Sequence, residues 1–205
     1  MFGSIQITQP NLLIVEGEED KRFFESLSIH LGLAEIQVLP IGGKTKLREN
    51  LKGLRDTANF PTVRSLGIVR DADADPYSAF QSVCDALNAN QLPAPSAPFI
   101  PIGHSPQVTI LILPGDGKPG MLEDICLEAV QDQPAMICVR EFFQCLNNHK
   151  ISFPTQKIKA EIQVFLASIE PEIRVGEAAE KSFWPWNHAA FSQIQNFLRQ
   201  IAGIA

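Results

Sequence analysis

Long apolar runs are missing from this 205-residue chain, and none approaches the roughly 20 residues of a membrane-spanning helix. Residues 1–10 also lack the basic start and the apolar stretch of a secretory signal. These absences predict a cytoplasmic protein that has no membrane partner. With 45% hydrophobic and 20% charged residues, the composition is ordinary for a globular protein with a full core.

Cysteine and histidine are scarce as well. The chain has four of each, and neither residue type shows the spacing of a zinc site or a redox motif. We expect Cys84, Cys126, Cys138 and Cys145 to be reduced, buried thiols. The sequence therefore predicts neither a zinc centre nor a disulfide framework.

An excess of positive charge is also absent. The net charge is −6 and the isoelectric point is near 5.2. Such a balance argues against a protein that coats nucleic acid non-specifically. A local basic surface could still bind phosphates, because part of the negative charge lies in two acidic clusters that bound cations would neutralise.

These two acidic clusters are the most informative feature that the chain does contain. Residues 12–15 are apolar and lead into a cluster at 16–20, and the apolar run 66–69 leads into a cluster at 71–75. Short runs of this kind are typical of buried parallel strands, whose carboxyl ends form the ligand site of open α/β sheets. Both clusters should meet at one edge, where their mutual repulsion favours a bound Mg²⁺ or Mn²⁺ ion.

The order of the apolar runs predicts an α/β fold with a mostly parallel, Rossmann-like sheet of about four strands flanked by helices. We expect residues 1–130 to form this core and residues 131–205 to form a helical extension packed on it within one structural unit. Prolines exclude a helix between 91 and 107 and leave room for a short edge strand at 99–102. The expected strands are 12–15, 36–41, 66–69 and 108–113, and the main expected helices are 18–31, 135–148, 155–168 and 188–202.

At the acidic clusters the sequence resembles the Toprim family, which includes topoisomerases, DnaG-type primases and OLD-type nucleases. The resemblance covers roughly residues 1–130. It rests on a strand followed by Glu-Gly and a helix, and on a later strand followed by Asp-x-Asp. It implies a Toprim-like fold, acid–base or metal chemistry for Glu16, and Mg²⁺ binding by Asp71 and Asp73.

The OLD-type nuclease branch is the more similar one. It adds a carboxylate one helical turn after the glutamate, matched by Asp20, and an acidic residue that opens a later helix, matched by Glu123. The branch also uses a late lysine near the metals, for which Lys157 and Lys159 are the candidates. The chain departs from the family pattern at Arg70, where a small or apolar residue is more usual.

A basic stripe accompanies the acidic clusters. It comprises Lys44, Arg48, Lys52 and Arg55, which recur at helical spacing after the second strand. Since that strand ends at the same edge of the sheet, the stripe could guide a DNA or RNA backbone towards the metals. A solvated helix face is the alternative interpretation.

Our first hypothesis is divalent-metal-dependent cleavage of phosphodiester bonds in nucleic acid. A second is a non-catalytic Toprim-like module that binds a metal and a partner protein or nucleic acid. A small-molecule phosphohydrolase is a third, but its covalent form needs an aspartate where this chain has Glu16. The first hypothesis assigns catalysis to Glu16 and Lys159, and one or two Mg²⁺ or Mn²⁺ ions to Glu16, Asp20, Asp71, Asp73 and Glu123.

Overall fold

The computed structural model describes residues 6–152 and 157–204. Within them, one sheet of four parallel strands has the order β2-β1-β3-β4. The α/β fold and its four strands are therefore confirmed, and the strand ends differ from the predicted ones by one or two residues. The strands are β1 (Asn11–Val15), β2 (Ile36–Pro40), β3 (Ser65–Asp71) and β4 (Gln107–Leu113).

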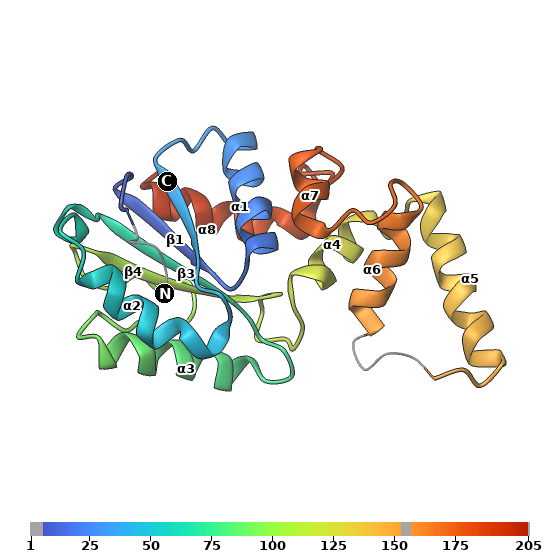
Figure 1. Cartoon of the computed structure of the whole chain (residues 1–205), viewed down its shortest axis with the longest axis horizontal. Coiled ribbons are helices and arrows are strands. Elements are labelled where there is room, and N and C mark those ends of the chain that lie inside the picture. The colour runs from blue at the N-terminus through green and yellow to red at the C-terminus, as the bar shows by residue number, and fades with distance from the viewer. Residues whose placement is uncertain (1–5, 153–156, 205) are drawn as a thin grey trace.

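Helices connect the strands and continue after the last one (Figure 1). Short 3-10 segments also occur, at Lys44–Lys46 (η1), Phe60–Thr62 (η2) and Ala189–Phe191 (η3). The α-helices are α1 (Glu18–His30), α2 (Leu47–Arg55), α3 (Pro76–Ala89), α4 (Leu122–Val130), α5 (Pro134–Asn148), α6 (Lys157–Ala167), α7 (Val175–Glu180) and α8 (Ser192–Ala202).

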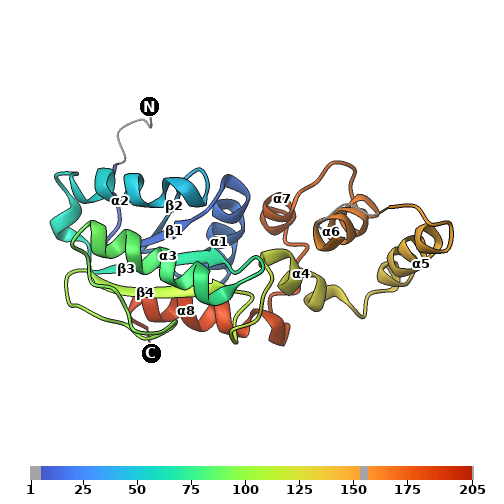
Figure 2. The same cartoon turned by 90° about the horizontal axis from the view of Figure 1, so that it is seen from below.

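Both faces of the sheet are covered by helices, as Figures 1 and 2 show. Successive strand residues point to opposite faces. Leu13 faces α1 and α8, where it shares a core with Phe23 and Phe197. Its neighbour Leu12 faces α2 and α3, where it shares a second core with Leu51. Burial on both faces explains why the strand sequences are continuous apolar runs rather than alternating apolar and polar residues.

The last helix, α8, returns to the sheet from the end of the chain. It contacts β1, β3 and β4. A Cβ atom added to Gly67 in β3 would lie 2.1 Å from Cδ1 of Ile201, so the glycine allows α8 to approach closely. The helices between α4 and α8 depart from this pattern, because α5 and α6 project away from the sheet in both views. The residues expected as one extension, 131–205, thus divide between this projection and the core.

The predicted helices at 135–148, 155–168 and 188–202 correspond to α5, α6 and α8. The first two residues of the second range lie outside the described residues. Helix α7 was not predicted. The edge strand expected at 99–102 is wrong, because only one antiparallel bridge forms, between Ile102 and Val108.

The cysteines follow the prediction in part. Cys84 and Cys126 are buried free thiols, whereas Cys138 and Cys145 are exposed, so their predicted burial is wrong. Both lie on α5, which projects from the sheet and leaves more of its surface open to solvent. Among residues 6–152 and 157–204, no helix has the length and apolarity needed to cross a membrane.

Candidate functional site

Five acidic side chains line one cleft at the carboxyl edge of the sheet, namely Glu19 of α1 and four residues that the sequence analysis selected. Glu16 directly follows β1, Asp20 lies in the first turn of α1, Asp71 ends β3, and Glu123 lies in the first turn of α4. The cleft has a volume of about 540 Å³, and Lys159 of α6 reaches it from the helical projection. The structure therefore brings together five residues that the sequence analysis selected.

Backbone N–H groups fix two of these carboxylates. Asp20 Oδ2 accepts a hydrogen bond from the N–H of Gly17 at 2.9 Å. Asp71 Oδ1 accepts one at 3.1 Å from the N–H of Leu122, the first residue of α4. The position of Asp71 is thus determined by both β3 and the start of α4, where a helix favours negative charge.

The cleft opposes ionisation of its carboxyl groups. Burial, together with the charges of Asp20, Glu123 and Glu16, raises the pKa of Asp71 to about 8. Burial also raises the pKa of Asp20 to about 6. It raises the pKa of Glu16 as well, although the nearby Arg70 guanidinium opposes this increase. Shifts of this kind cluster at functional sites.

Cationic side chains lie close to two of the acidic residues of the cleft. Lys159 Nζ lies 3.7 Å from Glu123 Oε1. Arg70 Nε lies 3.9 Å from Glu16 Oε1, yet both atoms are buried without a hydrogen-bond partner. Arg70, the departure from the family pattern, therefore supplies a positive charge inside the site. Of the two late lysines, Lys159 lines the cleft, whereas Lys157 forms an ion pair with Glu161 at 3.0 Å.

Asp73 does not follow the expected geometry. An extended chain would place the Asp71 and Asp73 side chains on one face, but Asp73 has φ of 51°, in the left-handed region. Its Oδ2 atom instead accepts a hydrogen bond from Lys44 Nζ at 2.8 Å. The expectation of a shared face is therefore wrong, and Asp73 lies beside Lys44 rather than among the residues that line the cleft.

Among the described residues, two side chains of the basic stripe form a hydrogen bond or an ion pair with other residues and two do not. Lys44 belongs to η1 and pairs with Asp73, and Arg55 donates to the carbonyl of Asn90 at 2.8 Å. Arg48 and Lys52 are exposed on α2. The apolar side of α2 is buried, so the stripe faces solvent along the middle of the helix. Asp75 caps α3, since its side chain accepts hydrogen bonds from the N–H groups of Tyr77 and Ser78.

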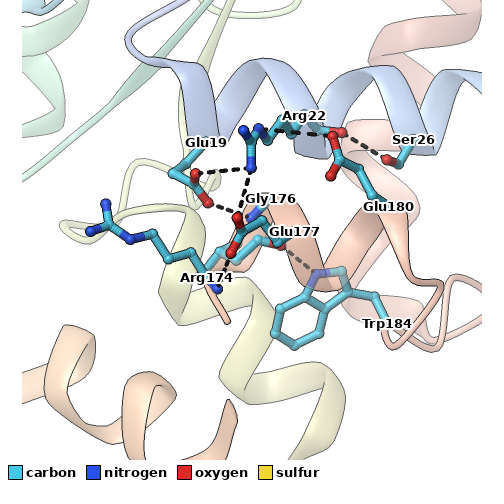
Figure 3. Close-up of polar contacts among 9 residues, drawn as sticks. Glu19, Arg22, Ser26, Arg174, Gly176, Glu177, Glu180 and Trp184 are labelled. Atoms are coloured by element: carbon cyan, nitrogen blue, oxygen red, sulfur yellow. Dashed lines mark hydrogen bonds and ion pairs between the residues drawn. The ribbon is translucent and has the colours of Figure 1, made fainter. Parts of the chain in front are cut away.

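Sequence reasoning missed Arg174, which lines the same cleft. It precedes α7, and Figure 3 shows its guanidinium pointing away from the contacts that hold α7 against α1. In those contacts Glu19 Oε2 accepts the N–H of Gly176 at 3.0 Å, and Arg22 Nη1 lies 3.0 Å from Glu177 Oε1. Because these partners are more than 150 positions apart, no local sequence signal could have identified Arg174.

The carboxylates are close but do not form a ready ligand set. Among the residues that the structure describes, no three or more His, Cys, Asp or Glu side chains are placed to hold a metal ion. Their chemistry nevertheless suits a hard cation, since carboxylate oxygens are preferred ligands of Mg²⁺ and Mn²⁺. The buried, unpartnered Oε1 atom of Glu16 is also available. To bind one metal ion together, these side chains would have to rotate towards one another.

A family model described as "Protein of unknown function (DUF3226)" matches residues 10–203. The chain belongs to the DUF3226 family. A search of curated proteins gives no match. The family match covers the sheet, the acidic cleft and the helical projection.

Solved structures similar to this DUF3226 chain include the C-terminal region of the OLD protein of Xanthomonas campestris pv. campestris. The mercury-phased structure has a TM-score of 0.52 and 14% identity, and the match covers 97% of this chain and 98% of that chain. The iodine-phased structure has a TM-score of 0.50 and 13% identity, with the same coverage. At this identity the likeness shows the fold alone. It confirms the structural side of the predicted resemblance to OLD proteins.

Proposed function

We propose that this protein cleaves phosphodiester bonds of nucleic acid with bound Mg²⁺ or Mn²⁺. The observation that carries the proposal is the convergence of Glu16, Asp20, Asp71 and Glu123 in one cleft, with raised pKa values for the first three. A cleft in which burial and mutual repulsion disfavour ionised carboxylates is stabilised strongly by a bound divalent cation. The fold shared with the C-terminal region of an OLD protein supports a nuclease-related function for this chain.

The four carboxylates are the proposed ligands, and Asp73 becomes a fifth if its contact with Lys44 opens. A bound divalent ion would polarise the phosphate and lower the pKa of its attached water. Glu16, the buried carboxylate with an unpartnered oxygen, would orient that water. Lys159, held 3.7 Å from Glu123, would stabilise negative charge as it develops on the phosphate.

Glu16→Gln tests this proposal. We expect wild type with Mn²⁺ to cut plasmid or single-stranded nucleic acid, and the variant to lose cutting by at least about 100-fold, because general acid–base groups contribute on that order. Glu18→Gln is a matched control in the same acidic cluster, since Glu18 is exposed and does not line the cleft. Both variants should retain the far-ultraviolet circular dichroism of wild type. Equal activity of Glu16→Gln and wild type would contradict the proposed role.

A non-catalytic metal- and partner-binding module is the second candidate. One observation favours it, namely the Lys44–Asp73 contact, which occupies a proposed ligand. Melting curves with Mg²⁺ or Mn²⁺ separate the candidates when they are measured beside cleavage. A metal-dependent rise in melting temperature, lost in Asp71→Asn, without cleavage of any DNA or RNA substrate would favour the module.

A further inference from the structure

A second cavity lies beside the loop that follows β4. It has a volume of about 410 Å³, which is within the range of roughly 300–1,000 Å³ typical of small-ligand sites. Its lining is mainly apolar and aromatic, with Tyr77 and Phe80 from α3, Phe99 from the proline-rich segment and Ile112 from β4. The polar groups at this cavity come from Asp116 and Gln193. A flat, apolar ligand with a polar edge would match this combination.

Tyr77 is the most exposed aromatic side chain of the lining. It is the only tyrosine of the chain, and 74% of its surface is accessible. Phe80 lies three residues later and therefore on the same side of α3. The backbone of Tyr77 is held at the start of α3, because its N–H donates a hydrogen bond to Asp75 Oδ1 at 3.0 Å. An exposed aromatic ring on a rigid helix start is a suitable stacking platform.

The cavity lies at the same edge of the sheet as the acidic cleft, beside the segments that follow β3 and β4, although the two share no lining residue. Asp73 and Gly120 exchange two backbone hydrogen bonds, of 2.9 and 2.8 Å, which join the segment after β3 to the loop after β4. Asp73 and Tyr77 are four residues apart, so their Cα atoms lie within about 15 Å. A polynucleotide with a phosphate at the carboxylates would therefore need to extend only a few nucleotides to place a base at Tyr77.

We propose that this cavity binds one base of a single-stranded nucleic acid, stacked on Tyr77 and Phe80, with Asp116 or Gln193 bonding to the base edge. The proposal rests on the proposed function and names its substrate class. A single strand is required because a base inside a duplex is paired and stacked and cannot enter the cavity. A folded protein partner fits less well, since stable interfaces bury about 800 Å² on each side, far more than one small cavity offers.

Binding of a fluorescein-labelled thymidine decamer tests the proposal. The measurement uses fluorescence anisotropy with Mg²⁺ in the Glu16→Gln background, so that the probe is not consumed. Tyr77→Ala should raise Kd roughly 5- to 150-fold, which corresponds to about 1–3 kcal/mol per stacked base. Tyr77→Phe should bind like the parent, because the ring is retained. Phe142→Ala, which removes a ring that is 47% exposed on the distant helix α5, should have no effect.

A decamer of the same length with abasic sugars separates base stacking from backbone contacts. We expect it to bind weakly and to be insensitive to Tyr77→Ala, and a uridine decamer shows whether RNA is accepted. Equal Kd values for Tyr77→Ala and its parent, or no binding of any oligonucleotide, would overturn the base site. Cleavage that depends on Glu16 but not on Tyr77 would leave the proposed function intact, whereas Tyr77-dependent binding without cleavage would contradict only the proposed function.

Discussion

Two opposing influences act on the carboxyl group of Asp71. Its hydrogen bond from the N–H of Leu122, at the start of α4, favours the charged form. Burial and the nearby charges of Asp20 and Glu123 favour the neutral form and dominate, since the pKa is about 8. Without a cation, Asp71 is therefore protonated in much of the neutral pH range, and ionising it costs folding free energy.

This cost predicts how stability changes with pH. The folded pKa values of Asp71 and Asp20, about 8 and about 6, both exceed the ordinary value of 3.8, so the folded protein binds more protons than the unfolded chain between these limits. In EDTA, the contribution of these two groups to the free energy of unfolding should therefore be largest near pH 4 and fall as pH rises to about 8. One unit of pKa shift corresponds to about 1.4 kcal/mol, so the decrease should be on the order of a few kcal/mol.

Asp71→Asn isolates the contribution of this residue, because asparagine keeps the oxygen that accepts the Leu122 N–H and cannot ionise. In urea titrations at stepped pH, the variant should lose less stability than wild type between pH 6 and 8. Asp132→Asn, an exposed control, should follow the wild-type curve. Parallel curves for wild type and Asp71→Asn would contradict the assigned pKa shift.

At the scale of elements, the parts that could be predicted are those whose own residues determine them. The strand β1 is apolar at every position and is buried at every position. Helix α2 carries Leu47, Leu51 and Leu54 at helical spacing and buries all three. Helix α7 was missed because it has six residues and includes a glycine, so packing against α1 rather than local propensity stabilises it.

The packing of α7 gives a prediction. A Cβ atom on Gly176 would lie 2.5 Å from the carbonyl oxygen of Glu19 and 2.8 Å from Cβ of Arg22, and the backbone atom cannot turn away. Gly176→Ala should push α7 from α1 and cost about 1–3 kcal/mol, as over-packing does. The exposed ion pair of Arg22 with Glu177, worth at most about 1 kcal/mol, could not compensate.

Gly53→Ala is the matched control, since Gly53 lies inside α2 with no atom within 4 Å of an added Cβ. Alanine should there stabilise the protein by about 0.5–1 kcal/mol, because glycine disfavours helix. Chemical denaturation measures both variants. A stability of Gly176→Ala at or above wild type would show that α7 is not held by this close approach.

At the scale of the whole molecule, the candidate site was predictable to the extent that it follows from strand order. Glu16 and Asp71 end neighbouring parallel strands, so their proximity follows from the sheet alone. The position of Arg174 depends instead on how the chain returns from the projecting helices. Similarly, the left-handed conformation of Asp73 arises from the pairing of its backbone with Gly120, which no periodicity reveals.

The distribution of charge over the molecule leads to the remaining prediction. The net charge of −6 repels nucleic acid, so binding requires local basic groups. Lys44, Arg48 and Lys52 are the exposed members of the stripe, and Lys44 is paired with Asp73. Each phosphate contact contributes about 0.7–0.9 to the slope of log K against log salt. Arg48→Gln combined with Lys52→Gln should therefore flatten the slope by up to about 1.8 and weaken binding uniformly across sequences.

A second double variant, Arg140→Gln with Lys150→Gln, removes the same amount of charge from α5 and from the turn that follows it. Its slope should match wild type, because local contacts rather than net charge release the counterions. Titrating a labelled oligonucleotide at several salt concentrations gives both slopes. If the two double variants behave alike, the stripe acts only through net charge. If the variant on α2 matches wild type, α2 presents a solvated face, and the nucleic acid must reach the cleft by another route.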